Sequence, residues 1–253
     1  MVDDEKRMEL TEHLAELRSR ILRSLLYLTV GSIICFFYFE KLFHLLLLPL
    51  EKGTRAAGIH WQVFIDKFTS PFFTVLQLSI VAGLILTAPL ITGEAWGFIA
   101  PALTREEKRP LKWLVPFSIV LFAGGVVLAY WAAPFAIQWF CGYIKVLGGT
   151  TLNQDPQHFV IFMVKLLAAF GAVFQLPIVL MFLAWVGILT ADGMKRSWRH
   201  AVVGISFVGL MVTPSNDPFT MLMMIIPVII LYLGSISLVA IVERNRNKRM
   251  GGA

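Results

Sequence analysis

Six apolar runs separated by polar connections constrain this chain more than any other feature of its sequence. A helix needs about 20 apolar residues to cross the ~30 Å hydrocarbon core of a bilayer, because each residue adds only ~1.5 Å. Most of the runs approach or exceed that length. The composition agrees, since 57% of the residues are apolar and only 15% are charged, against about a quarter charged in soluble domains. The sequence therefore predicts an all-α membrane protein.

We predict one polytopic membrane domain with six transmembrane helices, the fifth of which is short. The predicted spans are 21–39, 71–92, 111–135, 159–186, 201–213 and 219–242. The apolar part of the fifth, from Ala201 to Val212, covers only about 18 Å at the helical rise, which is less than the bilayer core.

The remaining segments are polar. In residues 1–20, leucines recur at helical spacing and give one apolar face, which predicts an amphipathic helix lying on the membrane surface. The connection 40–70 contains an apolar stretch too short to span, so we expect short helices packed on the outer face. Residues 243–253 are expected to be a flexible basic tail.

Lys and Arg are distributed unevenly between the two sides that six spans would define. Sixteen of the 22 lie in 1–23, 105–112, 195–199 and 244–249, which all fall on the side of the two termini. Basic residues accumulate on the cytoplasmic side of membrane proteins. The sequence therefore predicts that both termini are cytoplasmic.

The sequence carries none of the motifs that indicate an enzyme. There is no phosphate-binding loop, no H-E-x-x-H and no G-x-S-x-G, and the five histidines are scattered. Cys35 and Cys141 lie in or beside apolar runs without a C-x-x-C, so we interpret both as packing residues. We expect no catalytic activity, no cofactor, no metal and no nucleic-acid partner.

Four stretches carry a resemblance to a known family. They are His13-Leu-Ala-Glu-Leu-Arg-Ser-Arg20, Ser70-Pro-Phe-Phe-Thr74, Trp96-Gly-Phe-Ile-Ala-Pro-Ala-Leu103 followed by Glu107, and Thr213-Pro214 followed by Asp217. In this order the chain resembles TatC, the six-span receptor subunit of the twin-arginine protein translocase, over essentially its whole length.

The resemblance implies a function and partners. TatC proteins bind signal peptides with consecutive arginines at the cytoplasmic face of the bacterial inner membrane. With single-span TatA/TatB-type subunits they mediate the export of folded proteins, driven by the proton gradient. The resemblance also implies that this chain forms homo-oligomers within a larger complex in lipid.

The resemblance also implies a signal-peptide site. By position, Glu16 and Glu107 are the acids that face the two arginines, and Phe98 lines the same cytoplasmic site. Leu17 and Arg18 belong to its N-terminal wall.

Three further residues take expected roles within or near the membrane. Thr213 and Asp217, next to the short fifth span, match the region where partner helices dock in the family. Gln175 stands where relatives often carry a glutamate, and glutamine cannot titrate. It can hydrogen-bond to a neighbouring helix or to a signal peptide. Met221 replaces a glutamine found in many relatives, which weakens the expectation of a polar docking cluster there.

Each candidate also has a purely structural interpretation. Thr104 and Glu107 form a capping box that could open the third span. Glu16 can pair with Arg20 one helical turn later, a contact worth only ~0.2–0.5 kcal/mol on a helix surface. Phe98, like Trp96, sits where an interfacial aromatic belt is expected.

Two other functions remain as alternatives. A small secondary transporter would show an internal repeat and ionisable groups at mid-depth, and the spans show neither. An intramembrane enzyme would need a nucleophile and base, or metal ligands, at matching depth.

Overall fold

The computed structural model describes residues 10–65, 67–99, 111–212 and 217–250 of the chain. Glu107 and Thr213 lie outside these ranges. The elements in chain order are α1 (Leu10–Phe37), α2 (Phe39–Ala57), β1 (His60–Val63), α3 (Ser70–Ile99), α5 (Leu111–Val146), β2 (Thr151–Gln154), α6 (Pro156–Val173), α7 (Leu176–Val186), α8 (Ala191–Arg196), α9 (Trp198–Val212) and α10 (Pro218–Met250).

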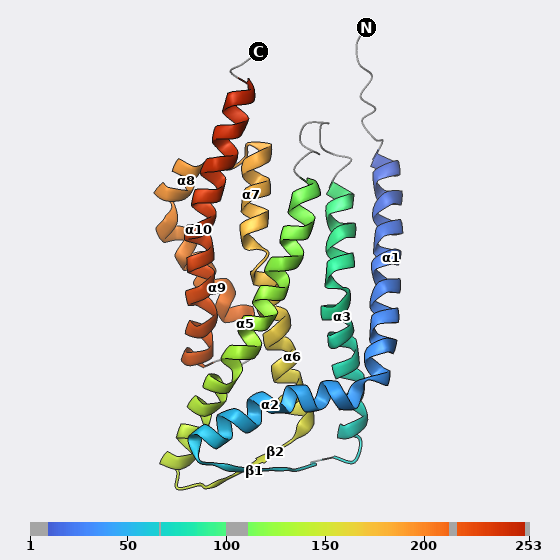
Figure 1. The fold of residues 1–253 in the computed structure, drawn as a ribbon, viewed down its shortest axis with the longest axis vertical. Helices are drawn as coiled ribbons and strands as arrows, with labels where there is room; N and C mark the ends of the chain where they lie inside the picture. The colour runs from blue at the N-terminus through green and yellow to red at the C-terminus, as the bar shows by residue number, and fades with distance from the viewer. Residues whose placement is uncertain (1–9, 66, 100–110, 213–216, 251–253) are drawn as a thin grey trace.

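The long helices stand side by side, and α2 lies across one end of them (Figure 1). The described residues contain five helices long and apolar enough to cross a membrane, His13–Phe37, Ser70–Phe98, Leu114–Val146, Pro156–Val186 and Pro218–Arg244. One further apolar helix, Trp198–Met211, is shorter, and it corresponds to the predicted short fifth span. The start of α1 and the end of α10 lie at the same end of the molecule, opposite α2 and the two strands (Figure 1).

Residues 10–20 differ from the prediction. From Leu10 onward there is no separate surface helix, because α1 runs without a break from Leu10 to Phe37 and joins the predicted amphipathic segment to the first span. Neither proline nor glycine interrupts residues 10–30, so nothing in the sequence ends the helix at residue 20.

The other helices also extend beyond the apolar runs. α3 ends at Ile99, so Glu94, Trp96 and Phe98 lie on its last turns and not in a loop. α10 continues through the basic segment as far as Met250, where a flexible tail was expected. Helical hydrogen bonding continues into polar residues at no cost once a helix is nucleated, so apolar length marks the span and not the helix end.

The predicted fourth span is two helices. α6 ends at Val173 and α7 begins at Leu176, with Gln175 at the N-cap position of α7. Pro177 falls in the first turn of α7, where its missing N–H breaks no hydrogen bond of that helix. In a continuous helix the same ring would remove one backbone hydrogen bond.

The two outer connections meet at one end of the molecule. β1 pairs in parallel with β2, with His60 opposite Thr151. Asp155 then caps α6 by accepting a hydrogen bond from Gln157 N at 2.7 Å, and it also accepts one from Ser70 Oγ at 3.1 Å. The expectation of short helices in 40–70 is only partly right, because α2 is one helix of 19 residues followed by a strand.

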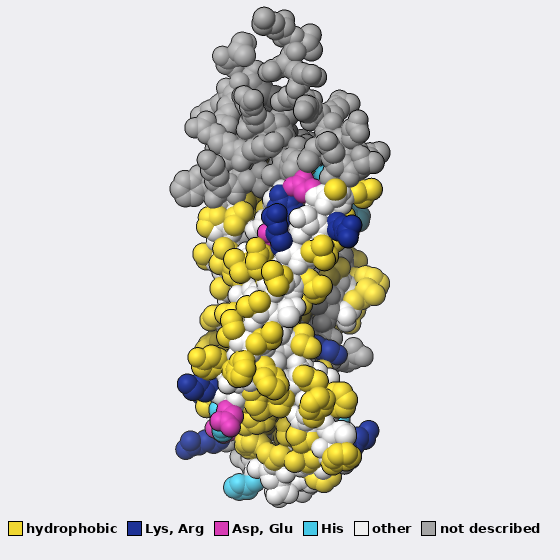
Figure 2. Space-filling model, turned by 90° about the vertical axis from the view of Figure 1, so that its right-hand side faces the viewer, with side chains coloured by type: hydrophobic (Ala, Val, Ile, Leu, Met, Phe, Trp, Pro, Cys, Tyr) yellow, Lys and Arg dark blue, Asp and Glu magenta, His cyan; other side chains and the backbone are white. Residues whose placement is uncertain are grey.

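Small residues allow α1 and α3 to pack closely. A Cβ added to Gly31 would lie 2.5 Å from Thr87 Cγ2, and one added to Gly83 would lie 2.5 Å from Ser32 N. Close approach through small residues is the usual way that membrane helices associate. This contact brings the backbones of α1 and α3 close together. One face of the molecule is covered by apolar side chains in its middle, with most charged side chains toward its two ends (Figure 2).

Candidate functional site

A network of charged side chains joins α1 to the last turns of α3. Arg20 donates to Glu16 Oε1 from Nε at 2.9 Å and from Nη2 at 2.6 Å. Its Nη1 donates to Glu94 Oε2 at 3.0 Å, although Glu94 is 74 residues further along the chain. The Glu16–Arg20 pairing was one of the interpretations that the sequence left open, and the structure contains it.

Two more side chains of α1 reach Glu94. Tyr27 Oη donates to its Oε1 at 3.3 Å. Arg23 Nη1 lies 3.9 Å from the same oxygen, and its side chain is more than half exposed. Gly97 makes room for the network, because a Cβ at this position would overlap the Arg20 guanidinium.

The other predicted wall residues lie around this network. Phe98 stacks on His13 of α1, with ring centroids 4.4 Å apart and planes 16° apart. Leu17 is half-buried on α1, and Arg18 is exposed. The structure therefore brings Glu16, Leu17, Arg18 and Phe98 to one end of the α1–α3 pair.

Trp96 is not a belt residue. Only 8% of it is exposed, and it packs in a buried cluster with Leu114 and Ile178. Its ring meets Phe182 of α7 edge to face, with centroids 5.3 Å apart. The interfacial interpretation fails for this residue because its ring is buried against side chains of α5 and α7.

Gln175 exchanges two hydrogen bonds with Ser118 of α5. Ser118 Oγ donates to Gln175 Oε1, and Gln175 Nε2 donates to the Ser118 carbonyl oxygen at 3.0 Å. Ser118 is fully buried. The break between α6 and α7 thus has a polar side chain that links it to α5.

Replacing Gln175 with leucine is expected to destabilise the fold without abolishing it. The change removes both contacts to Ser118, and hydrogen bonds between membrane helices contribute ~0.6–2 kcal/mol each. Chemical unfolding in detergent micelles measures the effect. Ser118→Ala in the leucine background should then cost much less than it does in the wild type, because the partner is already lost. Equal costs in both backgrounds would show that the pair contributes nothing.

Asp217 makes a local contact. Its Oδ1 accepts a hydrogen bond from Thr220 N at 2.8 Å, which caps the start of α10. Asp217 Oδ2 and Thr220 Oγ1 are buried without hydrogen-bond partners. Thr213, the other residue expected at the partner-docking region, lies outside the described residues.

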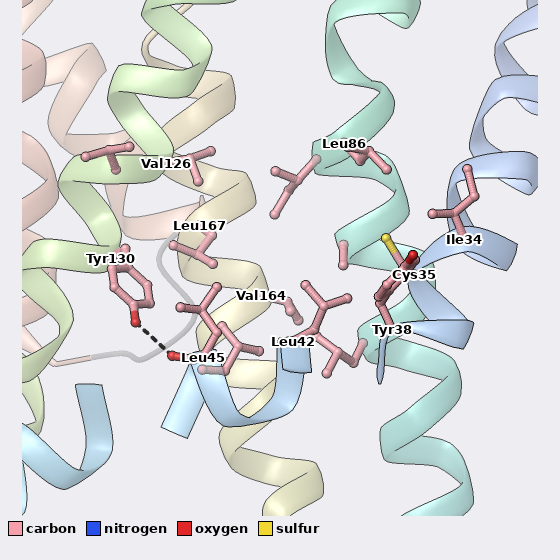
Figure 3. A pocket seen from close by; sticks show the side chains of 15 residues that line it. Ile34, Cys35, Tyr38, Leu42, Leu45, Leu86, Val126, Tyr130, Val164 and Leu167 are labelled. Atoms are coloured by element: carbon pink, nitrogen blue, oxygen red, sulfur yellow. Dashed lines mark hydrogen bonds between the residues drawn. The ribbon is translucent and has the colours of Figure 1, made fainter. Parts of the chain in front are cut away.

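An apolar cavity of about 510 Å³ opens between α1, α2, α3, α5 and α6 (Figure 3). Leu42, Leu86 and Leu167 are among the side chains that line it. Two tyrosines line it, and one of them, Tyr130, already donates a hydrogen bond to the Leu45 carbonyl oxygen at 2.8 Å. The cavity is suited to apolar chains and offers no charged group.

The sequence interpretation gave no role to several residues of the α1–α3 network, Glu94 among them, or to His13, which stacks on Phe98. Glu94 was part of no motif, and His13 entered only as the first residue of a run that carries the family resemblance and as one of five scattered histidines. A local sequence pattern cannot predict a contact between residues 74 positions apart. The one available signal for Glu94 was that this acid lies one helical turn before Phe98. Within the part of the chain that the structure describes, no group of three His, Cys, Asp or Glu could hold a metal ion.

A family model, related sequences and crystal structures all identify the same family for this chain. Residues 12–227 match the family of the Sec-independent protein translocase protein TatC. The TatC protein of Desulforapulum autotrophicum is 35% identical over 235 residues, which cover 92% of this chain and 84% of the relative. The chloroplastic TatC protein of Arabidopsis thaliana is 34% identical, over 95% of this chain and 69% of the relative.

A solved structure has the same fold. The crystal structure of a twin-arginine translocase receptor, TatC, superposes with a TM-score of 0.77 at 31% identity, over 91% of this chain and 99% of that chain. A second crystal structure of the receptor, in the detergent DDM, gives the same score at 32% identity. This chain is therefore a membrane-embedded, non-enzymatic transport component, and it belongs to the TatC family of Sec-independent protein translocase proteins.

Proposed function

We propose that this chain binds twin-arginine signal peptides at the end of the molecule where α1 meets α3. One observation carries the proposal: Glu16 already binds a guanidinium, through two hydrogen bonds from Arg20. Its carboxylate thus lies where a guanidinium can donate to it, and an arginine offers more donors in a fixed planar arrangement than a lysine ammonium does. Glu107, Phe98, Leu17 and Arg18 complete the proposed site.

The binding free energy that the acids can contribute is small compared with what a complex requires. Exposed ion pairs contribute at most ~1 kcal/mol each, whereas a complex with a Kd of 1 mM already requires about −4 kcal/mol. The acids therefore select the arginine pair. Most of the affinity comes from the apolar part of the signal peptide, lying along α3 and α6–α7 or in lipid. The apolar cavity between these helices offers surface of that kind.

The proposal includes an orientation and partners. The excess of Lys and Arg at the end that holds both termini supports a cytoplasmic location for this end, in the bacterial inner membrane. The short helix α9 supports docking of single-span TatA/TatB-type subunits near Asp217, because a short span holds a partner or thins the bilayer there. Export of folded proteins by such a complex, with several copies of this chain, would be driven by the proton gradient.

Site-specific photocrosslinking tests the proposed site. A photoreactive residue in place of Phe98 is expected to crosslink a signal peptide that carries Arg-Arg, and to crosslink its Lys-Lys version much less. Phe73, an exposed aromatic residue of α3 at the opposite end, serves as the control position and should crosslink neither. Equal crosslinking of the two peptides from Phe98 would show that this end is only a helix cap and an aromatic contact.

A further inference from the structure

Arg20 is shared between two carboxylates in a poorly exposed network. The exposed fractions of the side chains are 17% for Glu16, 23% for Arg20 and 13% for Glu94. Solvent screens such groups less than it screens surface charges, so their net charge matters to an approaching ion. Arg23 also reaches Glu94, but at 3.9 Å and with 58% of its side chain exposed its charge is largely screened.

The two oxygens of Glu16 are not equivalent. Oε1 accepts both hydrogen bonds from Arg20, whereas Oε2 is buried without a hydrogen-bond partner. Leaving a buried carboxylate oxygen unpaired costs free energy, and a charged donor relieves that cost best. The oxygen that lacks a donor belongs to the acid that the family resemblance assigns to an incoming arginine.

Glu94 and Gly97 keep Arg20 where it is. Glu94 accepts one hydrogen bond from Nη1 of Arg20 and another from Tyr27 Oη. Gly97 supplies the space in which the guanidinium lies. Arg20 is thus held on α3 as well as on its own helix, so it is a fixed part of the site and not a freely moving side chain.

The net charge of Glu16, Arg20 and Glu94 together depends on Glu94. Two carboxylates and one guanidinium leave this group of three with one negative charge, enough for one further guanidinium. With a neutral residue at position 94, Arg20 would neutralise Glu16 by itself, and an arriving cation would meet a pair with no net charge.

We propose that Glu94 is a positioning residue of the signal-peptide site: it holds and neutralises Arg20, so that Glu16 keeps its charge and offers Oε2 to one incoming guanidinium. Recognition by Glu16 is then a contact through a single oxygen. The inference rests on the proposed function, since it concerns the same peptide at the same site.

A charge-rescue experiment tests this role. In this experiment a fluorescent Arg-Arg signal peptide is titrated with the full chain in lipid nanodiscs, and the Kd is measured by anisotropy at two salt concentrations. E94Q preserves the size of the side chain and removes its charge, so it should weaken binding about fivefold, equivalent to ~1 kcal/mol, with a smaller dependence on salt. E94Q combined with R20Q restores the single negative charge and should return the affinity to within about twofold of the wild type.

Two further variants separate charge from structure. E94D retains the carboxylate and should bind nearly as tightly as the wild type. R20Q alone removes a competing cation and should bind at least as tightly, so weaker binding by R20Q overturns the proposal even if E94Q does not fold. Unchanged binding by E94Q, or no recovery in the double variant, overturns it as well.

The outcome also separates this inference from the proposed function. A wild-type chain that binds Arg-Arg and Lys-Lys peptides equally well contradicts both. A wild-type chain that prefers Arg-Arg, together with an E94Q chain that is indistinguishable from it, contradicts only the role of Glu94.

Discussion

Replacing Gly83 with valine is expected to force α1 away from α3 and to lower the free energy of unfolding by about 1–3 kcal/mol, the usual cost of overpacking a close contact. A Cβ at this position would lie 2.5 Å from Ser32 N and 2.7 Å from Ser32 Cα. Both atoms belong to the backbone of α1, so no side-chain rotation relieves the clash. Thermal unfolding in detergent, followed by loss of the monodisperse species, measures the effect.

The same change should disturb the candidate site from a distance. Separating the two helices would move Glu94 away from Arg20, because these residues lie on α3 and α1 and are held together by that packing. Gly124→Val on α5 is the matched control, since a Cβ there meets nothing within 4 Å. If the two valine variants unfold alike, close packing of α1 and α3 is not what stabilises this pair.

Replacing Glu107 with alanine is expected to abolish the preference for Arg-Arg over Lys-Lys peptides. A guanidinium can bind both oxygens of a carboxylate in one plane, whereas an ammonium cannot. Because Oε1 of Glu16 already binds Arg20, Glu107 is the acid that we expect to make this two-oxygen contact. Total affinity should fall by only about fivefold, because one exposed ion pair contributes at most ~1 kcal/mol. The ratio of the two dissociation constants is therefore the quantity to measure.

Glu106→Ala provides the control for this experiment. The neighbouring acid suits the start of a helix equally well, and we assign it only a favourable interaction with the helix dipole. It should keep the arginine preference. Export of a twin-arginine cargo at the wild-type level by the Glu107→Ala chain would show that Glu107 is a capping residue and not part of the site.

The sequence by itself determined the membrane class, the presence of long apolar helices and the one shorter apolar helix among them. These properties depend on hydrophobicity along the chain, which a stretch of residues carries without reference to the rest of the fold. The family resemblance likewise rested on local runs, such as the one from His13 to Arg20. It placed Glu16 and Phe98 in one site, and the structure brings them to the same end of the α1–α3 pair.

Helix ends were harder to predict from the sequence. The first span and the segment before it form one helix, and α3 and α10 continue into polar residues. Hydropathy changes at the membrane surface, whereas a helix ends only where its backbone hydrogen bonds fail. At Gln175 the two criteria disagreed in the other direction, because the structure divides one predicted span into the two helices α6 and α7.

Only the tertiary structure decided which side chains meet. Glu94 reaches Arg20, Phe98 stacks on His13, and Trp96 is buried against Phe182, in each case across a long separation in the chain. The first two contacts follow from the close packing of α1 on α3, and the third from the contact of Trp96 with α7. Packing of that kind depends on the shapes of two helix surfaces at once, and a pattern read along one helix contains only half of that information.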